Sequence, residues 1–202
     1  MRKKMLIISS VLFLFFQSHG QEMSLPTPPP AVKVIKKIGG EMTNQFQTAV
    51  REMCNCPLFD LSGILELFAE NSWIEVSTAN GNGKKRFKPR DYFETVNSLK
   101  CGDDPLYKDM SFEYIPVSPS EAKVSSLDGS YTATFRIKQI FEGKYVGRRK
   151  RKNYCDLTIK EVVIGFWHNE KEELMAKIIG VFVVKTKKCD ENDNYTDTAI
   201  NR

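Results

Sequence analysis

The segment SYTATFRIKQIFE at residues 130–142 shows the pattern that decides the fold. Its apolar residues Tyr131, Ala133, Phe135 and Ile137 alternate with polar ones. Alternation with a period of two is typical of a β-strand that has one face in the core. We therefore expect a long strand here, with these four side chains on its buried face.

Two further segments of the same kind follow this strand. They are YCDLTIKEVVIGFW at 154–167 and LMAKIIGVFVVKT at 174–186, and the polar turn HNEKEE lies between them. Upstream, MSFEYIPV at 110–117 contains a proline, which favours an edge strand or a bulge. Consecutive strands joined by turns predict an antiparallel meander.

Helical patterns dominate the chain before these strands. Residues Phe46, Ala49, Val50 and Met53 follow the spacing i, i+3, i+4, i+7 and so lie on one helix face. Asp60 suits the N-cap of a short second helix. This second helix would carry Ile64, Leu65 and Phe68. A strand is expected at 72–78, and a third helix at 88–100 with Pro89 in its first turn.

This order predicts an α+β fold in which N-terminal helices pack in a strongly curved antiparallel sheet, a cone-like barrel. The polar stretch ANGNGKK is expected to be a turn. Its GNG sequence lies between a strand and a helix, but its spacing does not match a nucleotide-binding loop.

The first twenty residues have the pattern of a secretory signal. Arg2, Lys3 and Lys4 precede an apolar run at 5–16, and small residues follow at the spacing of a cleavage site. An uncleaved anchor is the alternative. We expect a signal peptide at 1–20, a Pro-containing linker at 21–40, the α+β domain at 41–189 and an acidic tail at 190–202. The protein would then be exported, either periplasmic or secreted, without a transmembrane span in the mature chain.

Removal of the signal lowers the net charge of the chain. The chain has 30 basic and 25 acidic residues; three basic and no acidic residues lie in the signal, so the mature balance is 27 against 25, or +2. A nucleic-acid partner is therefore not indicated by net charge. A basic stretch remains at 144–152 and is interpreted as a solvated hairpin tip, with polyanion binding as the alternative. Its cationic residues are Lys144, Arg148, Arg149, Lys150, Arg151 and Lys152.

The five cysteines are all in the predicted mature chain. Exported proteins commonly form disulfides, and an odd count leaves at least one thiol free or paired between chains. The turn at 168–173 brings the start of one strand near the end of the next, which predicts a Cys155–Cys189 disulfide. His168 is the sole histidine after the predicted signal, and no residue cluster has metal-ligand spacing. No metal or cofactor is predicted.

Four segments carry a resemblance to a known family. They are ILELFAENSWIEVST at 64–78, KPRDYFETVNSL at 88–99, the strand pair at 143–166 and AKIIGVFVV at 176–184. Together they resemble the nuclear-transport-factor-2-like superfamily, the cystatin-like cone, over residues 42–188. Signal and composition are also similar to exported proteins of Bacteroidetes-type bacteria. The resemblance implies an internal pocket, a bulge near Gly180 and often a homodimer through the exposed sheet.

Enzymes of that superfamily project acid–base groups from the concave face of the sheet. Alternation places Glu161 on the face of Leu157, Ile159 and Val163, so we expect it in the pocket as a base. The alternatives are a bulge that turns Glu161 outward, or an ion pair with a neighbouring lysine. Asp156 and Thr158 then lie on the opposite face, in structural roles. Tyrosines are the expected hydrogen-bond donors. The candidate catalytic residues are Glu161, Tyr92 and Tyr131, and the candidate pocket residues are Trp73, Tyr114 and Phe135.

We therefore expect an exported, non-catalytic binding or interaction domain with an internal pocket. Its partner would be an unknown small molecule or protein. The first alternative is a small acid–base enzyme of the isomerase or hydratase type that uses Glu161. The second alternative is a polyanion or surface adaptor that uses the basic stretch at 144–152.

Overall fold

The structure, a computed structural model, describes residues 30–56, 61–81, 83–115, 122–127, 130–146 and 152–189. The signal, the acidic tail, the Asp60 cap and Arg148–Arg151 are predictions that lie outside these residues. Within the described residues the fold is α+β, and no helix there is long and apolar enough to cross a membrane. Its elements are α1 (Val32–Glu52), α2 (Leu61–Leu65), β1 (Phe68–Val76), β2 (Lys85–Phe87), α3 (Pro89–Cys101), β3 (Tyr107–Ile115), β4 (Lys123–Leu127), β5 (Ser130–Tyr145), β6 (Lys152–His168) and β7 (Leu174–Lys188).

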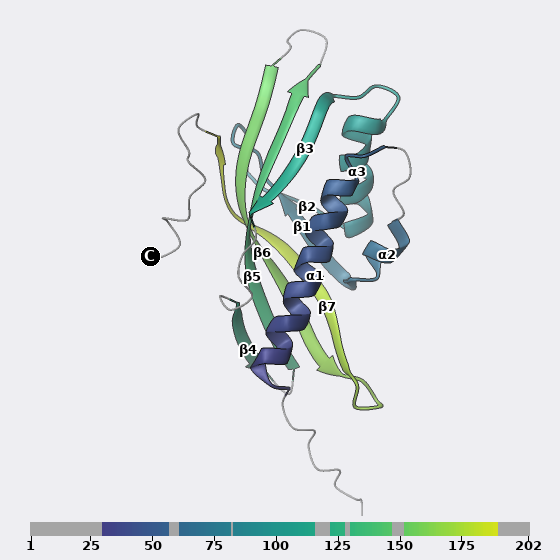
Figure 1. Cartoon of the computed structure of the whole chain (residues 1–202), viewed down its shortest axis with the longest axis vertical. Coiled ribbons are helices and arrows are strands. Elements are labelled where there is room, and N and C mark those ends of the chain that lie inside the picture. Colours follow the sequence, from purple (N-terminus) through teal and green to yellow (C-terminus); the bar gives the residue numbers. More distant parts are fainter. Residues whose placement is uncertain are drawn as a thin grey trace, which may run out of the picture.

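The strands form one curved sheet in the order β2-β1-β7-β6-β5-β3, and β4 also pairs with β5. Neighbouring strands among β5, β6 and β7 are antiparallel, as the meander prediction requires, whereas β1 and β7 are parallel. β3 and β4 pair with opposite ends of β5. Figure 1 shows α1 running along one side of the sheet, with α2 and α3 beside it. The expected curved sheet with N-terminal helices is confirmed, and all of its strand pairs except β1–β7 are antiparallel.

The core lies between α1 and the sheet. Phe46 of α1 is buried and meets Phe68 and Phe93 edge to face, with ring centroids 6.1 and 6.5 Å away. Gly39 faces Phe135 so closely that a Cβ would clash with the ring. The helix begins at Val32, so residues 32–40 belong to α1 rather than to the predicted linker. Buried Ile35 continues the apolar face into these first turns, which accounts for the earlier start.

Two boundaries differ from expectation near β1 and β5. Phe68 is the first residue of β1 and not part of the second helix, which ends at Leu65. β5 continues to Tyr145, so Gly143 lies within a strand, opposite Tyr154 of β6. A glycine is needed there because a Cβ would lie 2.8 Å from the Tyr107 ring.

The predicted orientation of β6 is wrong. Val162 pairs with Phe135 and Lys160 pairs with Ile137, and residues directly opposite each other in a sheet share a face. The even-numbered residues of β6 therefore face the helices, and Glu161 faces outward with Leu157, Ile159 and Val163. The inward-facing residues, all buried, are Asp156, Thr158, Lys160, Val162, Ile164 and Phe166.

The pairing of β6 with β7 is interrupted twice. The register shifts between Ile159 and Lys160, and again between Val163 and Ile164, where Gly180 and Ile178 are the partners. Such shifts mark β-bulges, which bend a strand locally. The second shift lies next to Gly180, where the sequence predicted a bulge.

Two disulfides connect distant parts of the chain. Cys155 and Cys189 form the predicted bond, with their Cα atoms 5.4 Å apart. A second bond joins Cys56 to Cys101, with a Cα separation of 5.7 Å, and links the end of α1 to the end of α3. The sequence did not indicate this pair. Cys54 is the free, buried thiol that the odd count required.

Candidate functional site

A cavity of about 150 Å³ lies between α3 and the inward face of the sheet, and we call it the inner pocket. Its apolar wall includes Val96 and Leu99 of α3 together with Phe112 and Phe141 from the strands. Polar side chains enter it from β5 and β6, at the end where the inward face of β6 changes from apolar to polar residues. These side chains are Gln139, Asp156, Thr158 and Lys160.

Lys160 is the most unusual residue of the inner pocket. Only 2% of it is exposed, and its neighbours across the sheet are Ile137 and Val183. Its ammonium lies 5.7 Å from the centre of the Tyr92 ring, and it has no hydrogen bond or ion pair with any described residue. Burial lowers the pKa of Lys160 to about 8, because removal from water disfavours the charged form.

Asp156 lies at the other polar end of the pocket and is 3% exposed. Its Oδ2 accepts hydrogen bonds from the Tyr154 hydroxyl at 2.5 Å and from the Ala79 backbone N–H at 3.1 Å. Burial and the adjacent Asp156 raise the pKa of Tyr154, so the phenol keeps its proton and remains a donor. The Oδ1 atom is buried and has no hydrogen-bond partner among the described residues.

Gln139 and Tyr92 lie between these two ends. Gln139 is directly opposite Thr158 in the sheet, and its buried Oε1 has no partner in the described part of the chain. Tyr92 comes from α3 and is 2% exposed. Burial raises the pKa of its phenol, so Tyr92 enters any chemistry as a neutral group.

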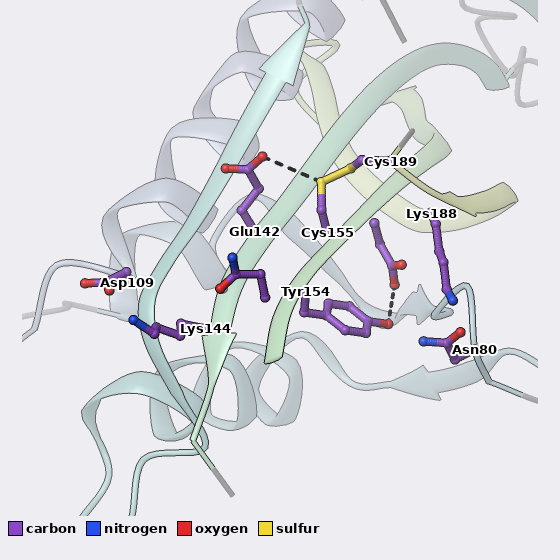
Figure 2. Close-up of a pocket in the computed structure, with 11 residues that line it drawn as sticks. Asn80, Asp109, Glu142, Lys144, Tyr154, Cys155, Lys188 and Cys189 are labelled. Atoms are coloured by element: carbon purple, nitrogen blue, oxygen red, sulfur yellow. Dashed lines mark hydrogen bonds between the residues drawn. A yellow bond between two sulfur atoms is a disulfide. The ribbon is translucent and has the colours of Figure 1, made fainter. Parts of the chain in front are cut away.

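A larger cavity of about 600 Å³, which we call the outer pocket, adjoins the inner one. Tyr154 and Asp156 line both cavities and so form the wall between them. In Figure 2 the Tyr154 hydroxyl points toward the side of Asn80 and Lys188, whereas Lys144 and Asp109 lie on the other side. The Cys155–Cys189 disulfide borders the same cavity. A ligand that enters from the outer pocket would meet the Tyr154–Asp156 pair first.

Aromatic packing holds Tyr154 in this wall. Its ring centroid lies 5.8 Å from that of Phe141 and 6.2 Å from that of Tyr107, both edge to face. Tyr107 and Phe141 also contact each other at 5.3 Å. Since each such pair adds about 0.5–1.5 kcal/mol beyond area burial, the wall is a packed part of the fold.

Of the residues predicted for the site, Tyr92 lines the inner pocket. Trp73 does not: it is 39% exposed, and the Lys88 ammonium lies 4.3 Å from its ring centre. Phe135 is buried under α1, against Gly39. Tyr131 is partly buried and packs against the core near the opposite end of β5.

Tyr114 and Glu161 also lie outside the lining of the two pockets. Tyr114 is partly buried against the core, and its buried hydroxyl has no partner among the described residues. Glu161 accepts a hydrogen bond from Arg136 at 2.8 Å on the outward face. An ion pair was one of the expected alternatives, but the partner is an arginine and not a lysine. The placement removes the support for Glu161 as a base in the pocket.

Sequence reasoning missed the polar residues that the pocket contains. Asp156 and Thr158 were assigned to the outward face, and Lys160 and Gln139 were not considered. One signal was present: Asp156, Thr158 and Lys160 alternate with apolar residues, so one face of this strand end had to be polar. Among the described residues no group of three potential ligands could hold a metal ion.

No protein-family model matches the sequence, and no curated protein is significantly similar to it. Several solved structures are similar in fold. A hexachlorocyclohexane dehydrochlorinase has 8% identity and a TM-score of 0.45, with 84% of this chain and 98% of that one covered. An NTF2-like superfamily protein from Salmonella enterica has 9% identity and a TM-score of 0.44, with 83% and 100% covered.

A third structure is an NTF2-like protein with a cystatin-like fold from Novosphingobium aromaticivorans. It has 11% identity and a TM-score of 0.37, and the match covers 80% of this chain and 86% of that one. The first of these structures is named as an enzyme, and the other two are named only for their fold or superfamily. The chain is thus similar in fold to NTF2-like proteins, and the similarity extends to the fold alone.

Proposed function

We propose that this protein is an exported binding domain whose inner pocket takes a small anionic organic ligand. The observation that carries this proposal is the burial of Lys160 in a cavity where no carboxylate of the described residues forms an ion pair with it. A buried ammonium is costly unless it is paired and hydrogen-bonded. A carboxylate on a ligand would supply that pairing.

The rest of the pocket limits the size and polarity of the ligand. Apolar side chains of α3 and the strands surround the cavity, so the body of the ligand should be apolar. A cavity of about 150 Å³ holds a molecule about as large as benzene. Benzoate combines one aromatic ring with one carboxylate and is therefore a suitable probe.

Calorimetric titration of the mature chain with benzoate tests the proposal. We expect saturable binding, and we expect Lys160→Met to weaken it at least ten-fold, which corresponds to about 1.4 kcal/mol. Glu161→Gln is the matched control, because it changes the neighbouring residue on the outward face. Absence of binding at millimolar benzoate, or equal binding by the Lys160→Met variant, would contradict the proposal.

The pKa of Lys160 favours a second function, amine chemistry on a carbonyl compound. Burial lowers this pKa to about 8, so a fraction of the side chain is a neutral amine near neutral pH. With benzaldehyde, Nζ would attack the carbonyl carbon and lose water to give an imine. Borohydride would then deliver hydride to the C=N bond and leave a secondary amine. Mass spectrometry should find this adduct on Lys160, and labelling confined to exposed lysines would exclude the function.

Export and partners complete the proposed function. The two disulfides support export, because such bonds persist in oxidising compartments. Intact mass of exported material should show a chain beginning at Gln21. A homodimer through the outward face of the sheet, and polyanion binding through the basic stretch at 144–152, stay predictions. Lys144 is exposed beside the outer pocket, as either solvation or polyanion binding requires.

A further inference from the structure

Three buried polar groups of the inner pocket have no hydrogen-bond partner among the described residues, and they comprise one donor and two acceptors. The Lys160 ammonium is a donor without a described acceptor, whereas Asp156 Oδ1 and Gln139 Oε1 are acceptors without a described donor. Buried polar atoms in folded proteins nearly always have partners, so each exception needs an explanation. Three exceptions lining one small cavity indicate a ligand that carries the complementary groups.

Strand geometry orders these groups along the cavity. Asp156 and Lys160 are four residues apart on one face of β6, which separates their Cα atoms by about 13 Å. Gln139 faces the same cavity from β5, beside Thr158 and midway between them. The cation is thus at one end of the row, and the acceptors are in the middle and at the other end.

We propose that the inner pocket binds a monocyclic aromatic acid that carries a hydrogen-bond donor, an amine or hydroxyl, on the ring. The carboxylate pairs with Lys160, the ring lies against the apolar wall, and the donor reaches Asp156 Oδ1 or Gln139 Oε1. This inference rests on the proposed function and specifies the ligand class. The Lys160 ammonium and at least one of the two acceptors then have partners at the same time, and an amine has a second N–H for the other acceptor.

Other ligand classes leave one of these needs unmet. A dicarboxylate would place an acceptor against the Asp156 oxygen, and a neutral arene would leave the Lys160 ammonium buried without an acceptor. An aromatic amine without an acid group would satisfy the acceptors but not the cation. A polar group left unpaired on burial costs more than a hydrogen bond returns, which makes a pocket of this kind selective.

The test compares benzoate, 3- and 4-aminobenzoate, and aniline by calorimetric titration. An aromatic amine mainly donates hydrogen bonds, so its effect on affinity tests whether the pocket offers acceptor atoms. We expect the better aminobenzoate to bind wild-type protein about ten-fold more tightly than benzoate, because a hydrogen bond to a charged acceptor forms. Aniline should bind more weakly than either acid.

Two variants assign the effect to residues. Asp156→Asn can keep an oxygen toward the Tyr154 hydroxyl and the Ala79 N–H, which places an NH₂ donor where Oδ1 was. It should abolish the preference for aminobenzoate over benzoate if Oδ1 is the acceptor, and Gln139→Leu should abolish it if Oε1 is the acceptor. Lys160→Met should weaken both acids and leave aniline unchanged. A cooperative urea unfolding transition of Asp156→Asn shows that this variant is folded.

The outcomes separate the two proposals. If benzoate binds through Lys160 but wild-type protein does not prefer either aminobenzoate, the donor inference is wrong and the anionic-ligand function stands. If the preference persists in Asp156→Asn and in Gln139→Leu, the acceptors are not these residues and the inference is likewise overturned. If neither acid binds, the proposed function itself fails. The wild-type comparison decides the matter even if a variant does not fold.

Discussion

Glu75 and Lys160 are both buried charged residues of the same sheet, but their surroundings differ. Glu75 is 5% exposed and belongs to β1; Lys160 is 2% exposed and belongs to β6. Val183 of β7 lies between them, since it pairs with Lys160 and donates its N–H to Glu75. The two side chains thus test what a buried charge does when it is paired and when it is not.

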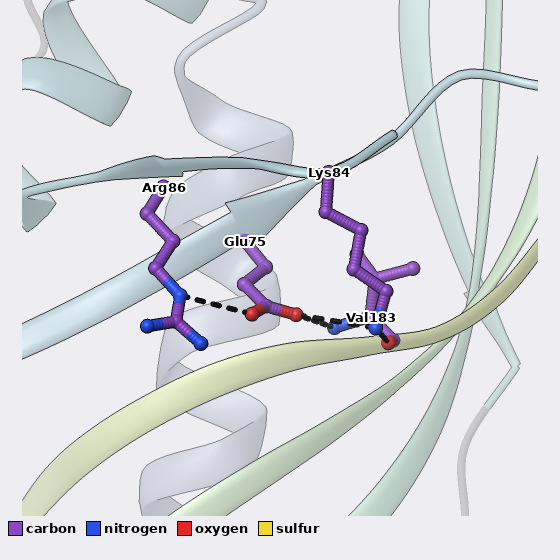
Figure 3. A network of polar contacts seen from close by, with 4 residues as sticks. All are labelled: Glu75, Lys84, Arg86 and Val183. Carbon is purple, nitrogen blue, oxygen red and sulfur yellow. Dashed lines mark hydrogen bonds and ion pairs between the residues drawn. The ribbon is translucent and has the colours of Figure 1, made fainter. Parts of the chain in front are cut away.

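The Glu75 carboxylate has partners on both oxygens. Oε1 accepts from Arg86 at 3.1 Å, while Oε2 accepts from the Val183 N–H at 3.1 Å and lies 3.5 Å from the Lys84 ammonium (Figure 3). Burial by itself raises the pKa of Glu75, but these hydrogen bonds and the charge of Lys84 outweigh it, so the pKa lies below its ordinary value. Glu75 therefore joins β2 and β7 to β1 and has a structural role.

Lys160 lacks such a set of partners within the described residues. Its neighbours are apolar or aromatic, and burial lowers its pKa to about 8. Burial of a charge therefore does not by itself identify a site, since buried Glu75 has a structural role. A buried charge indicates a site when it has no hydrogen-bond or ion-pair partner and adjoins a cavity, because a ligand can then supply the partner.

Removal of the unpaired charge should have the largest effect on stability. Lys160→Met keeps the length of the side chain and deletes the ammonium. We expect the free energy of unfolding to rise by about 3 kcal/mol near pH 7, since a pKa difference of one unit corresponds to about 1.4 kcal/mol. Urea denaturation of both proteins without ligand measures this. A destabilised Lys160→Met variant would mean that the ammonium has a stabilising partner.

The same residue predicts a pH dependence. The unfolded chain keeps an ordinary lysine pKa of 10.5, whereas the folded value is about 8, so the unfolded state binds more protons between these pH values. Stability should therefore rise with pH between about 8 and 10 in wild-type protein, relative to Lys160→Met. Tyrosines also titrate toward the alkaline end, and subtraction of the variant's curve removes their contribution. Parallel curves would contradict the lowered pKa.

Much of the fold could be predicted from sequence because its signals are local. Spacing placed Phe46 and Val50 on a helix face, and alternation placed Phe135 and Ile137 on the buried face of β5. The β5–β6 hairpin supplies no such local signal. Both faces of β6 carry apolar residues, so alternation did not determine which face was buried.

The side of β6 that faces the pocket depends on the turn before it. Tyr145 pairs with Lys152, so an even number of residues, 146–151, connects the two strands. One residue more or fewer would move Glu161 inward and Lys160 outward, because strand side chains alternate with a period of two. The candidate site was therefore missed through the length of a connection, although the fold was predicted correctly.

Neutralising the paired charge of Glu75 should change the free energy of unfolding in the opposite direction to Lys160→Met. Glu75→Gln removes the charge while leaving an amide oxygen for one of the three donors. We expect the free energy of unfolding to fall by about 2 kcal/mol at pH 7, less than for a fully buried pair, since Lys84 and Arg86 are half exposed and can turn to water.

Acid should erase this difference. The folded-state pKa of Glu75 is lowered, so its stabilising contribution is present above the ordinary glutamate value and is lost as the pH falls through the folded value. Urea denaturation at pH 7 and at successively lower pH, for wild-type protein and Glu75→Gln, measures it. An undiminished difference in acid would show that packing, and not charge, holds β2 in place.

Glu161→Gln should have the smallest effect and completes the comparison. Glu161 is next to Lys160 in sequence but lies on the outward face, where it pairs with Arg136 at 2.8 Å. Its side chain is 32% exposed and that of Arg136 is 41% exposed, so water weakens the pair, and such pairs contribute about 0.2–1 kcal/mol. We expect a loss of stability within that range, a smaller loss in high salt, and unchanged affinity for benzoate. A marked loss of benzoate binding would mean that Glu161, although on the outward face, affects ligand affinity in the inner pocket, and that Lys160 and Glu161 do not act independently.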